Sequence, residues 1–416
     1  MAGLTLPMLL KQRAEAAKLG RPRSKKNVIL FWLSGGPSHI DMWDPKPDAP
    51  SEIRGPFDSI PTKVSGVRVS EHLPLTAKLM DKLTILRGVD CSASNHTPIT
   101  MQTGNPLARR TNDGGGYPSM GSIAAKFKGP NHPGMPAFVG LANSWRSDVW
   151  EAGHMGSAFA PVNGKSLAGR LAMPEGLSTN RLRERGSLLG QLDRMHRDLE
   201  NNPAVAQLDH YTHQALDTVL SGRAKNAFNL EKETAKMRDF YGRDSIGEKA
   251  LFARRLVEAG STFVLVSGAW GYFDHHGDEV RWGGIKKGLQ PLMPRVDRTL
   301  NAIVTDLGQR GLLDDTLVLM MGEFGRSPVM TKTAGRGHWA RVMSMVMAGG
   351  SLNHGRVIGS TDRKGYDVAT RRVGPSDLAA TVFQHLGIDL DTHWTNAQGR
   401  PIPIVTEGGQ PISELF

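Results

Sequence analysis

The 416-residue sequence predicts an α/β fold: one doubly wound, mostly parallel sheet with helices on both faces. Two observations carry this prediction. Short, continuous apolar runs alternate with amphipathic helical patterns, as they do when parallel strands are buried on both faces. Several of these runs end in polar or Gly-rich turns, which is typical of the carboxyl ends of strands in such sheets. We expect one domain over residues 28–416, preceded by a leader over residues 1–27.

The first strand is expected at residues 28–33 (VILFWL), an apolar run that opens into Ser34-Gly-Gly-Pro. The other expected elements follow along the chain. Further strands are expected at 83–86, 136–141, 262–266, 316–321 and 342–347, and helices at 119–127, 248–259, 292–307 and 376–386. Between about 180 and 260 the pattern changes to long amphipathic helices, which predicts a helical insertion in the domain.

Composition and charge exclude several classes of protein. Hydrophobic residues at 39% and charged residues at 22% exclude a disordered or coiled-coil chain. No apolar run approaches the roughly 20 residues of a transmembrane helix, so no transmembrane segment is expected. The net charge of +11 favours anionic partners. Because the basic residues are scattered outside 11–26, without the stripe that nucleic acids require, no nucleic-acid partner is expected.

The N-terminal residues and the cysteine content bear on localisation. The start, MAGLTLPMLL followed by AEAA, is similar to the apolar and cleavage regions of an export signal, without the basic segment that precedes them. We therefore expect export to the periplasm or cell envelope from a longer precursor, with an ordinary leader helix as the alternative. The single cysteine, Cys91, excludes an internal disulfide and Cys-based zinc frameworks.

Polar residues concentrate after the strands that end near residues 33, 86, 266 and 321, where the chemistry of such sheets is expected. The strongest cluster is Asp274-His275-His276, because imidazole and carboxylate together bind Zn²⁺ or Mn²⁺ well. A solvated polar loop is the alternative reading. Glu323 and His338, from later loops, are placed to complete a metal site.

The remaining candidates each have a structural alternative. Arg326 follows Glu323 by three residues and could clamp an anionic oxygen or form a structural ion pair. His39 and Asp41 could be metal ligands, a base with its orienting carboxylate, or turn residues.

The candidate nucleophiles lie in the loop after the expected strand at 83–86. Ser94 and Thr97 flank His96 there, and a hydroxyl could serve as the nucleophile, although most loop hydroxyls only bond the backbone.

The order of these motifs resembles the DUF1501 family. The segments that carry the resemblance are WLSGGPSHID (32–41), DPKP (44–47), Asn95-His96, PSMG (118–121), Asp274-His-His, GEFGRSP (322–328) and Gly399-Arg-Pro. That family is abundant in planctomycete-like bacteria, often carries a twin-arginine export signal and is grouped with the alkaline phosphatase and sulfatase superfamily. The resemblance implies an alkaline-phosphatase-like fold, with metals at the strand carboxyl ends, that hydrolyses phosphate or sulfate esters.

The superfamily's site is matched in part. Asp274, with His276 or His275, matches the Asp/His pair of one metal site, and His338 matches its later His. Glu323 stands where the superfamily has the Asp of a second Asp-His pair. Ser94 or Thr97 lies at the offset of the nucleophile.

The departures from the superfamily pattern favour one metal site over two. Phe324 replaces the His of the second pair. The Asp of the first strand is absent from Ser34-Gly-Gly, so Asp41 would have to substitute. The family's usual acid before His338 is Gly337 here. Cys91 lacks the following Pro-Ser-Arg, so formylglycine-dependent sulfatase chemistry is not expected.

The leading hypothesis is a metal-dependent hydrolase of small or polymeric anionic phosphate or sulfate esters, using Zn²⁺, Mn²⁺ or Ca²⁺. The alternative is a catalytically degenerate member that binds an anionic, sulfated glycan or envelope component. The catalytic candidates are Ser94, His96, Thr97 and Arg326, and the metal candidates are His39, Asp41, Asp274, His275, His276, Glu323 and His338.

Overall fold

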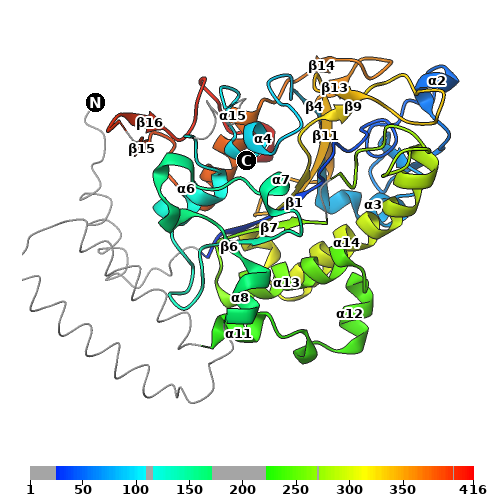
Figure 1. Cartoon of the computed structure of the whole chain (residues 1–416). Coiled ribbons are helices and arrows are strands. Elements are labelled where there is room, and N and C mark those ends of the chain that lie inside the picture. Colours follow the sequence, from blue (N-terminus) through cyan, green and yellow to red (C-terminus); the bar gives the residue numbers. More distant parts are fainter. Residues whose placement is uncertain (1–24, 109–115, 171–221, 269–270, 397) are drawn as a thin grey trace, which may run out of the picture.

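A central eight-stranded sheet forms the core of the computed structural model, which describes residues 25–108, 116–170, 222–268, 271–396 and 398–416 (Figure 1). The strand order is β12-β4-β11-β8-β1-β7-β5-β6. The strands are β1 (Asn27–Trp32), β4 (Leu83–Val89), β5 (Phe138–Leu141), β6 (Val162–Asn163), β7 (Phe263–Ser267), β8 (Thr316–Met321), β11 (Met343–Gly349) and β12 (Arg356–Ile358).

The sheet is mostly parallel. β1 pairs in parallel with β7 and β8, β5 pairs in parallel with β6 and β7, and β12 pairs in parallel with β4. β11 runs antiparallel to both of its neighbours, β4 and β8. The carboxyl ends of β1, β4, β7 and β8 therefore lie along one edge of the sheet. The predicted fold class is confirmed, with strand bounds within a few residues of those expected.

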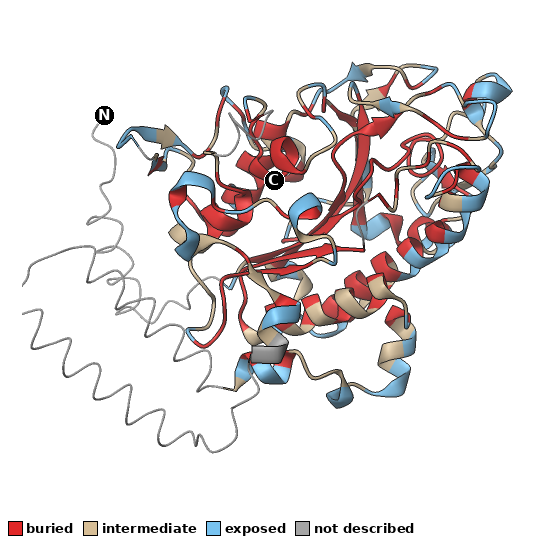
Figure 2. Ribbon diagram, viewed as in Figure 1, coloured by how far each residue is buried: buried red, intermediate tan, exposed pale blue. Residues whose placement is uncertain are grey.

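Both faces of the sheet are buried, which explains the continuous apolar strands (Figure 2). Along β1, Ile29 and Phe31 point into one hydrophobic core, and Leu30 and Trp32 point into the other. Side chains alternate between the two faces of a strand, so a strand covered on both sides has no polar face.

Helices cover the two faces. One core includes residues of α3 (Pro74–Leu79), α13 (Ser245–Ala259) and α14 (Gln290–Gln309). The other includes residues of α4 (Ile99–Thr103), α6 (Met120–Phe127) and α15 (Pro375–Leu386). The remaining helices are α2 (Ser51–Arg54), α7 (Trp145–Asp148), α8 (Gly164–Arg170), α11 (Arg223–Ala227) and α12 (Ala235–Tyr241). None of the described helices is long and apolar enough to span a bilayer.

The predicted insertion at 180–260 is described only from residue 222, where α11, α12 and α13 follow one another. α13 begins three residues before the expected start because Asp244 caps it, accepting from the N–H groups of Ile246 and Gly247. The expected leader lies outside the described residues up to residue 24.

Four two-stranded ribbons complete the described structure. They are β2 (Ser59–Pro61) with β3 (Arg68–Ser70), β9 (Gly325–Arg326) with β10 (His338–Trp339), β13 (Ser360–Thr361) with β14 (Val368–Thr370), and β15 (His393–Thr395) with β16 (Pro401–Pro403). The β9–β10 ribbon matters for function because it sets His338 directly opposite Arg326.

We predict that His385 makes stability depend on acid pH. Its Nε2 lies 3.0 Å from the carbonyl oxygen of Asn27, and burial lowers its pKa from 6.5 to about 4. The unfolded chain then binds the proton first, so stability is lost as pH falls from about 6.5 to about 4, by about 3 kcal/mol at most. Denaturant unfolding at several pH values should show a shallower decline for His385→Gln than for wild type. Equal declines would contradict the assignment.

Candidate metal centre

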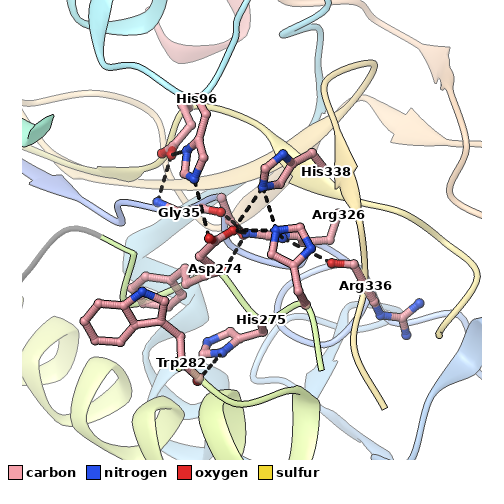
Figure 3. Close-up of polar contacts among 12 residues, drawn as sticks. Gly35, His96, Asp274, His275, Trp282, Arg326, Arg336 and His338 are labelled. Atoms are coloured by element: carbon pink, nitrogen blue, oxygen red, sulfur yellow. Dashed lines mark hydrogen bonds and ion pairs between the residues drawn. The ribbon is translucent and has the colours of Figure 1, made fainter. Parts of the chain in front are cut away.

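Loops from three strand ends and the β9–β10 ribbon meet at the carboxyl edge of the sheet (Figure 3). His96 comes from the loop after β4, and Asp274 and His276 come from the loop after β7. Glu323 follows β8, and His338 lies on β10. His96 and His338, 242 positions apart in the chain, thus become neighbours because parallel strands end at one edge.

Asp274 is the centre of this cluster. Its Oδ1 lies 3.0 Å from Nε2 of His338 and 3.0 Å from Nε2 of His276, and its Oδ2 lies 3.6 Å from Nε2 of His96. The Nε2 atoms of His276 and His338 are themselves 2.9 Å apart. Ligand atoms of His96, Asp274 and His338 all lie within 4.8 Å of one another.

These residues fit a divalent metal. Imidazole nitrogens and a carboxylate are common zinc ligands, and metal–ligand bonds of about 2.0–2.2 Å bring donor atoms to roughly 3 Å from one another. The cluster shows this spacing among Asp274, His276 and His338. It is the one group of this kind among the residues that the structure describes.

Arg326 holds Asp274 in place. Its guanidinium, 1% exposed, donates to Oδ1 of Asp274 at 2.6 Å. The donor of this bond, Nη2, also donates to the carbonyls of Gly35 and Phe273, and Nε donates to the carbonyl of Gly36. Nη1 donates to the carbonyl of Arg336 and lies 3.5 Å from Nε2 of His276. Since these contacts occupy the whole guanidinium, the structure favours the structural ion pair over the clamp for a substrate anion.

Glu323 orients His96. Its Oε1 accepts from Nδ1 of His96 at 2.8 Å and from the backbone N–H of Gly35 at 2.8 Å. A carboxylate on Nδ1 fixes the tautomer and leaves Nε2 of His96 to face Asp274, as in metal-bound histidines. Glu323 thus orients the His96 ring through Nδ1, the nitrogen that does not face Asp274.

The same contacts shift two pKa values. Burial lowers the pKa of His96, but its hydrogen bonds to Asp274 and Glu323 outweigh burial and raise it to about 9. Burial raises the pKa of Asp274, but hydrogen bonds from His338, His96 and Arg326 outweigh it, so the pKa lies far below its usual range. Asp274 is therefore ionised, and His96 carries a proton that a metal must displace.

A glycine allows the loops after β1 and β7 to approach each other. Gly35 has φ of +109°, and a Cβ there would lie 2.5 Å from the backbone nitrogen of Asp274. Any other residue would push Asp274 away from the cluster, so the Gly-rich turn after the first strand has a direct packing reason.

His275 lies apart from its two sequence neighbours. Its side chain turns toward Trp282, with Nδ1 3.1 Å from the Trp282 carbonyl oxygen, away from His338 (Figure 3). Burial lowers its pKa to about 4, so it is neutral. Of the two histidines that the sequence offered as the partner of Asp274, the structure brings His276 to the cluster.

Asp41 and His39 also lie outside the cluster. Both oxygens of Asp41 accept from the buried Arg336, at 2.6 and 3.0 Å, and Ser38 donates to the same carboxylate. Nε2 of His39 lies 2.9 Å from the carbonyl of Gly365, and burial lowers its pKa. The Asp41–Arg336 pair supports the cluster indirectly, because the Arg336 carbonyl receives a hydrogen bond from Arg326.

The two candidate nucleophiles are engaged within their own loop. Ser94 Oγ donates to the carbonyl of Asn95 at 3.4 Å, and Thr97 Oγ1 donates to the side-chain oxygen of Asn95. Phe324 is buried with its ring centroid 4.8 Å from that of His338 and 5.4 Å from that of His96. It forms an apolar wall on one side of the cluster.

Two buried residues near the candidate metal centre, Arg336 and Asp148, were not among the candidates from the sequence. Arg336 gave no signal, because its partner Asp41 lies 295 residues away. Asp148, at the end of α7, accepts from Ser267 Oγ at 2.7 Å, and burial raises its pKa to about 6. It follows the strand β5, so attention to that strand's carboxyl end could have found it.

Nearly the whole chain matches one protein family. The model of the family described as "Protein of unknown function (DUF1501)" matches residues 25–416. The chain belongs to the DUF1501 family. The predicted family is thus confirmed over nearly the whole chain, while no curated protein matches it.

Three solved structures illustrate what this DUF1501 protein is similar to. Ps i-CgsB, in complex with k-i-k-neocarrahexaose, is 13% identical with a TM-score of 0.42, over 88% of this chain and 72% of that one. The PsFucS1 sulfatase from Pseudoalteromonas sp. is 14% identical with a TM-score of 0.41, over 91% and 70%. The lipoteichoic acid synthase LtaP from Listeria monocytogenes is 11% identical with a TM-score of 0.39, over 92% and 76%.

We predict that Arg336→Met strongly destabilises the protein, because the substitution leaves the Asp41 carboxylate buried without its cation. The expected loss is about 3–5 kcal/mol in denaturant unfolding. Arg341→Met is the matched control. Arg341 pairs with Asp367 on the surface, so its loss should cost less than about 1 kcal/mol. Equal losses for the two variants would show that the buried pair is not structural.

We predict that metal affinity rises with pH. Below its pKa of about 9, His96 must release a proton when a metal binds. Affinity for Zn²⁺ or Mn²⁺ should therefore rise by about tenfold per pH unit between about pH 6.5 and 8. Calorimetric titration measures both the affinity and the proton release. His393→Asn, which changes an exposed histidine on β15, should keep the wild-type slope. A pH-independent affinity would contradict the assignment of His96.

Proposed function

We propose that this DUF1501 protein is a metal-dependent hydrolase of phosphate or sulfate esters. The observation that carries the proposal is the convergence of His96, Asp274 and His338 at the carboxyl edge of the sheet, with His276 in contact. Three imidazoles and an ionised carboxylate at this spacing form a donor set that suits a divalent metal.

The donor set favours Zn²⁺ or Mn²⁺ over Ca²⁺. Calcium takes six to eight oxygen ligands, whereas nitrogen-rich sites suit zinc and other transition metals. Here His96, His276 and His338 offer nitrogen and Asp274 offers oxygen. A divalent metal in such a site polarises an ester oxygen and lowers the pKa of bound water.

The protein's own residues would position the ligands and shape the site. Arg326 holds the Asp274 carboxylate, and Glu323 holds the His96 ring. Phe324 covers one side of the His96 and His338 imidazoles with an apolar ring. The anionic substrate is supported by the net charge of +11. We also propose that the protein acts in the cell envelope, on the basis of the export-like N-terminal sequence.

The test combines metal analysis with turnover of p-nitrophenyl phosphate and p-nitrophenyl sulfate. We predict bound metal at one equivalent, turnover of at least one of the two esters, and loss of both properties in Asp274→Ala. Glu323→Gln should lower metal affinity or activity by about 10–100-fold, because it weakens the support of His96. Asp239→Ala, which removes an exposed carboxylate on α12, is the matched control and should behave as wild type.

A contrary outcome would favour the alternative function. Protein that stays metal-free after incubation with Zn²⁺ and Mn²⁺, cleaves neither ester, and still binds a sulfated polysaccharide would be a binding protein with a degenerate site. The replacement of a superfamily histidine by the buried Phe324 is the feature that favours this alternative.

A further inference from the structure

The loop after β7, which carries Asp274 and His276, also lines a second feature. It is a cavity of about 410 Å³, which we name the Trp282 pocket; the residues that matter here are Tyr272, His275, Arg281, Trp282, Lys287 and Arg295. Its volume is within the range of roughly 300–1,000 Å³ of small-molecule sites. The pocket lies between the loop after β7 and the start of α14.

Three cations surround this pocket. Arg281, Lys287 and Arg295 are all exposed, and none forms an ion pair with any residue that the structure describes. The acid in the lining, Asp278, is already used, because its Oδ1 accepts from the backbone N–H groups of Gly284 and Lys287, both at 3.0 Å. With three cations and one carboxylate in its lining, the pocket carries an excess of positive charge.

Two aromatic rings supply its apolar wall. Tyr272 and Trp282 pack edge to face, with ring centroids 5.7 Å apart. The guanidinium of Arg281 lies 4.8 Å from the Trp282 ring centroid, which holds this exposed cation in place by a cation–π contact. The wall and the cations together suit a ligand with both a ring face and anionic groups.

A buried histidine reaches the pocket without a full set of partners. His275 is 2% exposed, and its Nε2 has no hydrogen-bond partner among the described residues. Buried polar nitrogens are rarely left unpaired, whereas this nitrogen lacks a partner among the described residues. Its neighbour Asp274 belongs to the metal centre, and consecutive Cα atoms lie about 3.8 Å apart. One short peptide segment thus lines both sites.

We propose that the Trp282 pocket binds an anionic sugar unit of a polyanionic glycan, next to the ester held at the metal centre. The position next to the ester rests on the proposed function, whereas the pocket's own ligand class does not. A small monoester would leave these three cations and two rings unused. A nucleic acid would require a longer basic groove along its backbone, whereas these cations are gathered around one cavity.

The positions of the cations near the metal centre also support an anionic ligand in the Trp282 pocket. Arg326, the cation nearest to the cluster, is consumed by Asp274 and backbone carbonyls. Anionic groups of a substrate must therefore meet other cations. The Trp282 pocket provides three, and its lining includes His275, which follows Asp274 in the chain.

The test is equilibrium binding of a dextran sulfate oligosaccharide by the full chain, with neutral dextran of the same length and a single-stranded oligothymidylate for comparison. We expect wild type to bind dextran sulfate well above both. The double variant Lys287→Ala/Arg295→Ala should lose about tenfold or more, since two charge-assisted contacts are removed. The matched control, Lys286→Ala/Arg298→Ala, removes two exposed cations from η5 (Ile285–Leu289) and α14 outside the lining and should bind as wild type.

Equal loss in the two double variants, no loss in the first, or tighter binding of the oligothymidylate would overturn the proposal. Because these cations are exposed, the variants should fold, and thermal melting checks this.

The same binding measured in Asp274→Ala separates the two proposals. Binding that persists in Asp274→Ala would show that the pocket works without the metal centre. Wild type that binds dextran sulfate through Lys287 and Arg295 but cleaves neither ester would retain the pocket and reject the hydrolase. If wild type cleaves an ester but the Lys287→Ala/Arg295→Ala variant binds dextran sulfate as well as wild type does, the hydrolase is retained and the pocket is rejected.

Discussion

The buried guanidinium of Arg326 is the contact on which the candidate metal centre depends. It ties the backbone after β1 to the backbone and carboxylate of the loop after β7, and it also bonds the carbonyl of Arg336. On β9 it pairs directly with His338. A buried charge is tolerated because every direction in which it can donate is occupied. Asp274 can therefore be held ionised among imidazoles.

The basic excess of the chain divides into two groups with different roles. Arg254, Arg326 and Arg336 are buried and paired with carboxylates, so they hold segments of the fold together. Arg281 and its neighbours at the Trp282 pocket are exposed and lack ion pairs among the described residues, so their field is available to ligands. The net charge of +11 counts both groups alike and cannot distinguish them.

Much of the fold and part of the candidate site followed from local patterns. Apolar runs located the main strands, and the rule that loops at strand carboxyl ends meet pointed to Asp274, Glu323 and His338. The role of His39 and Asp41 could not be decided, since two polar residues in a turn fit a site or a structural pair equally well. The partner of Asp41 is 295 residues away, beyond any local pattern.

The sequence by itself determined the fold class, the family and the loops in which the chemistry is placed, because periodicity, Gly-rich turns and motif order are written in the chain. The tertiary structure decided the direction of each side chain within those loops. His275 and His276 are identical neighbours, yet one faces Trp282 and the other faces His338. Arg326 could serve a substrate or the protein, and its burial against Asp274 decides for the protein. Side-chain direction depends on backbone turns and distant partners, which only the packed molecule contains.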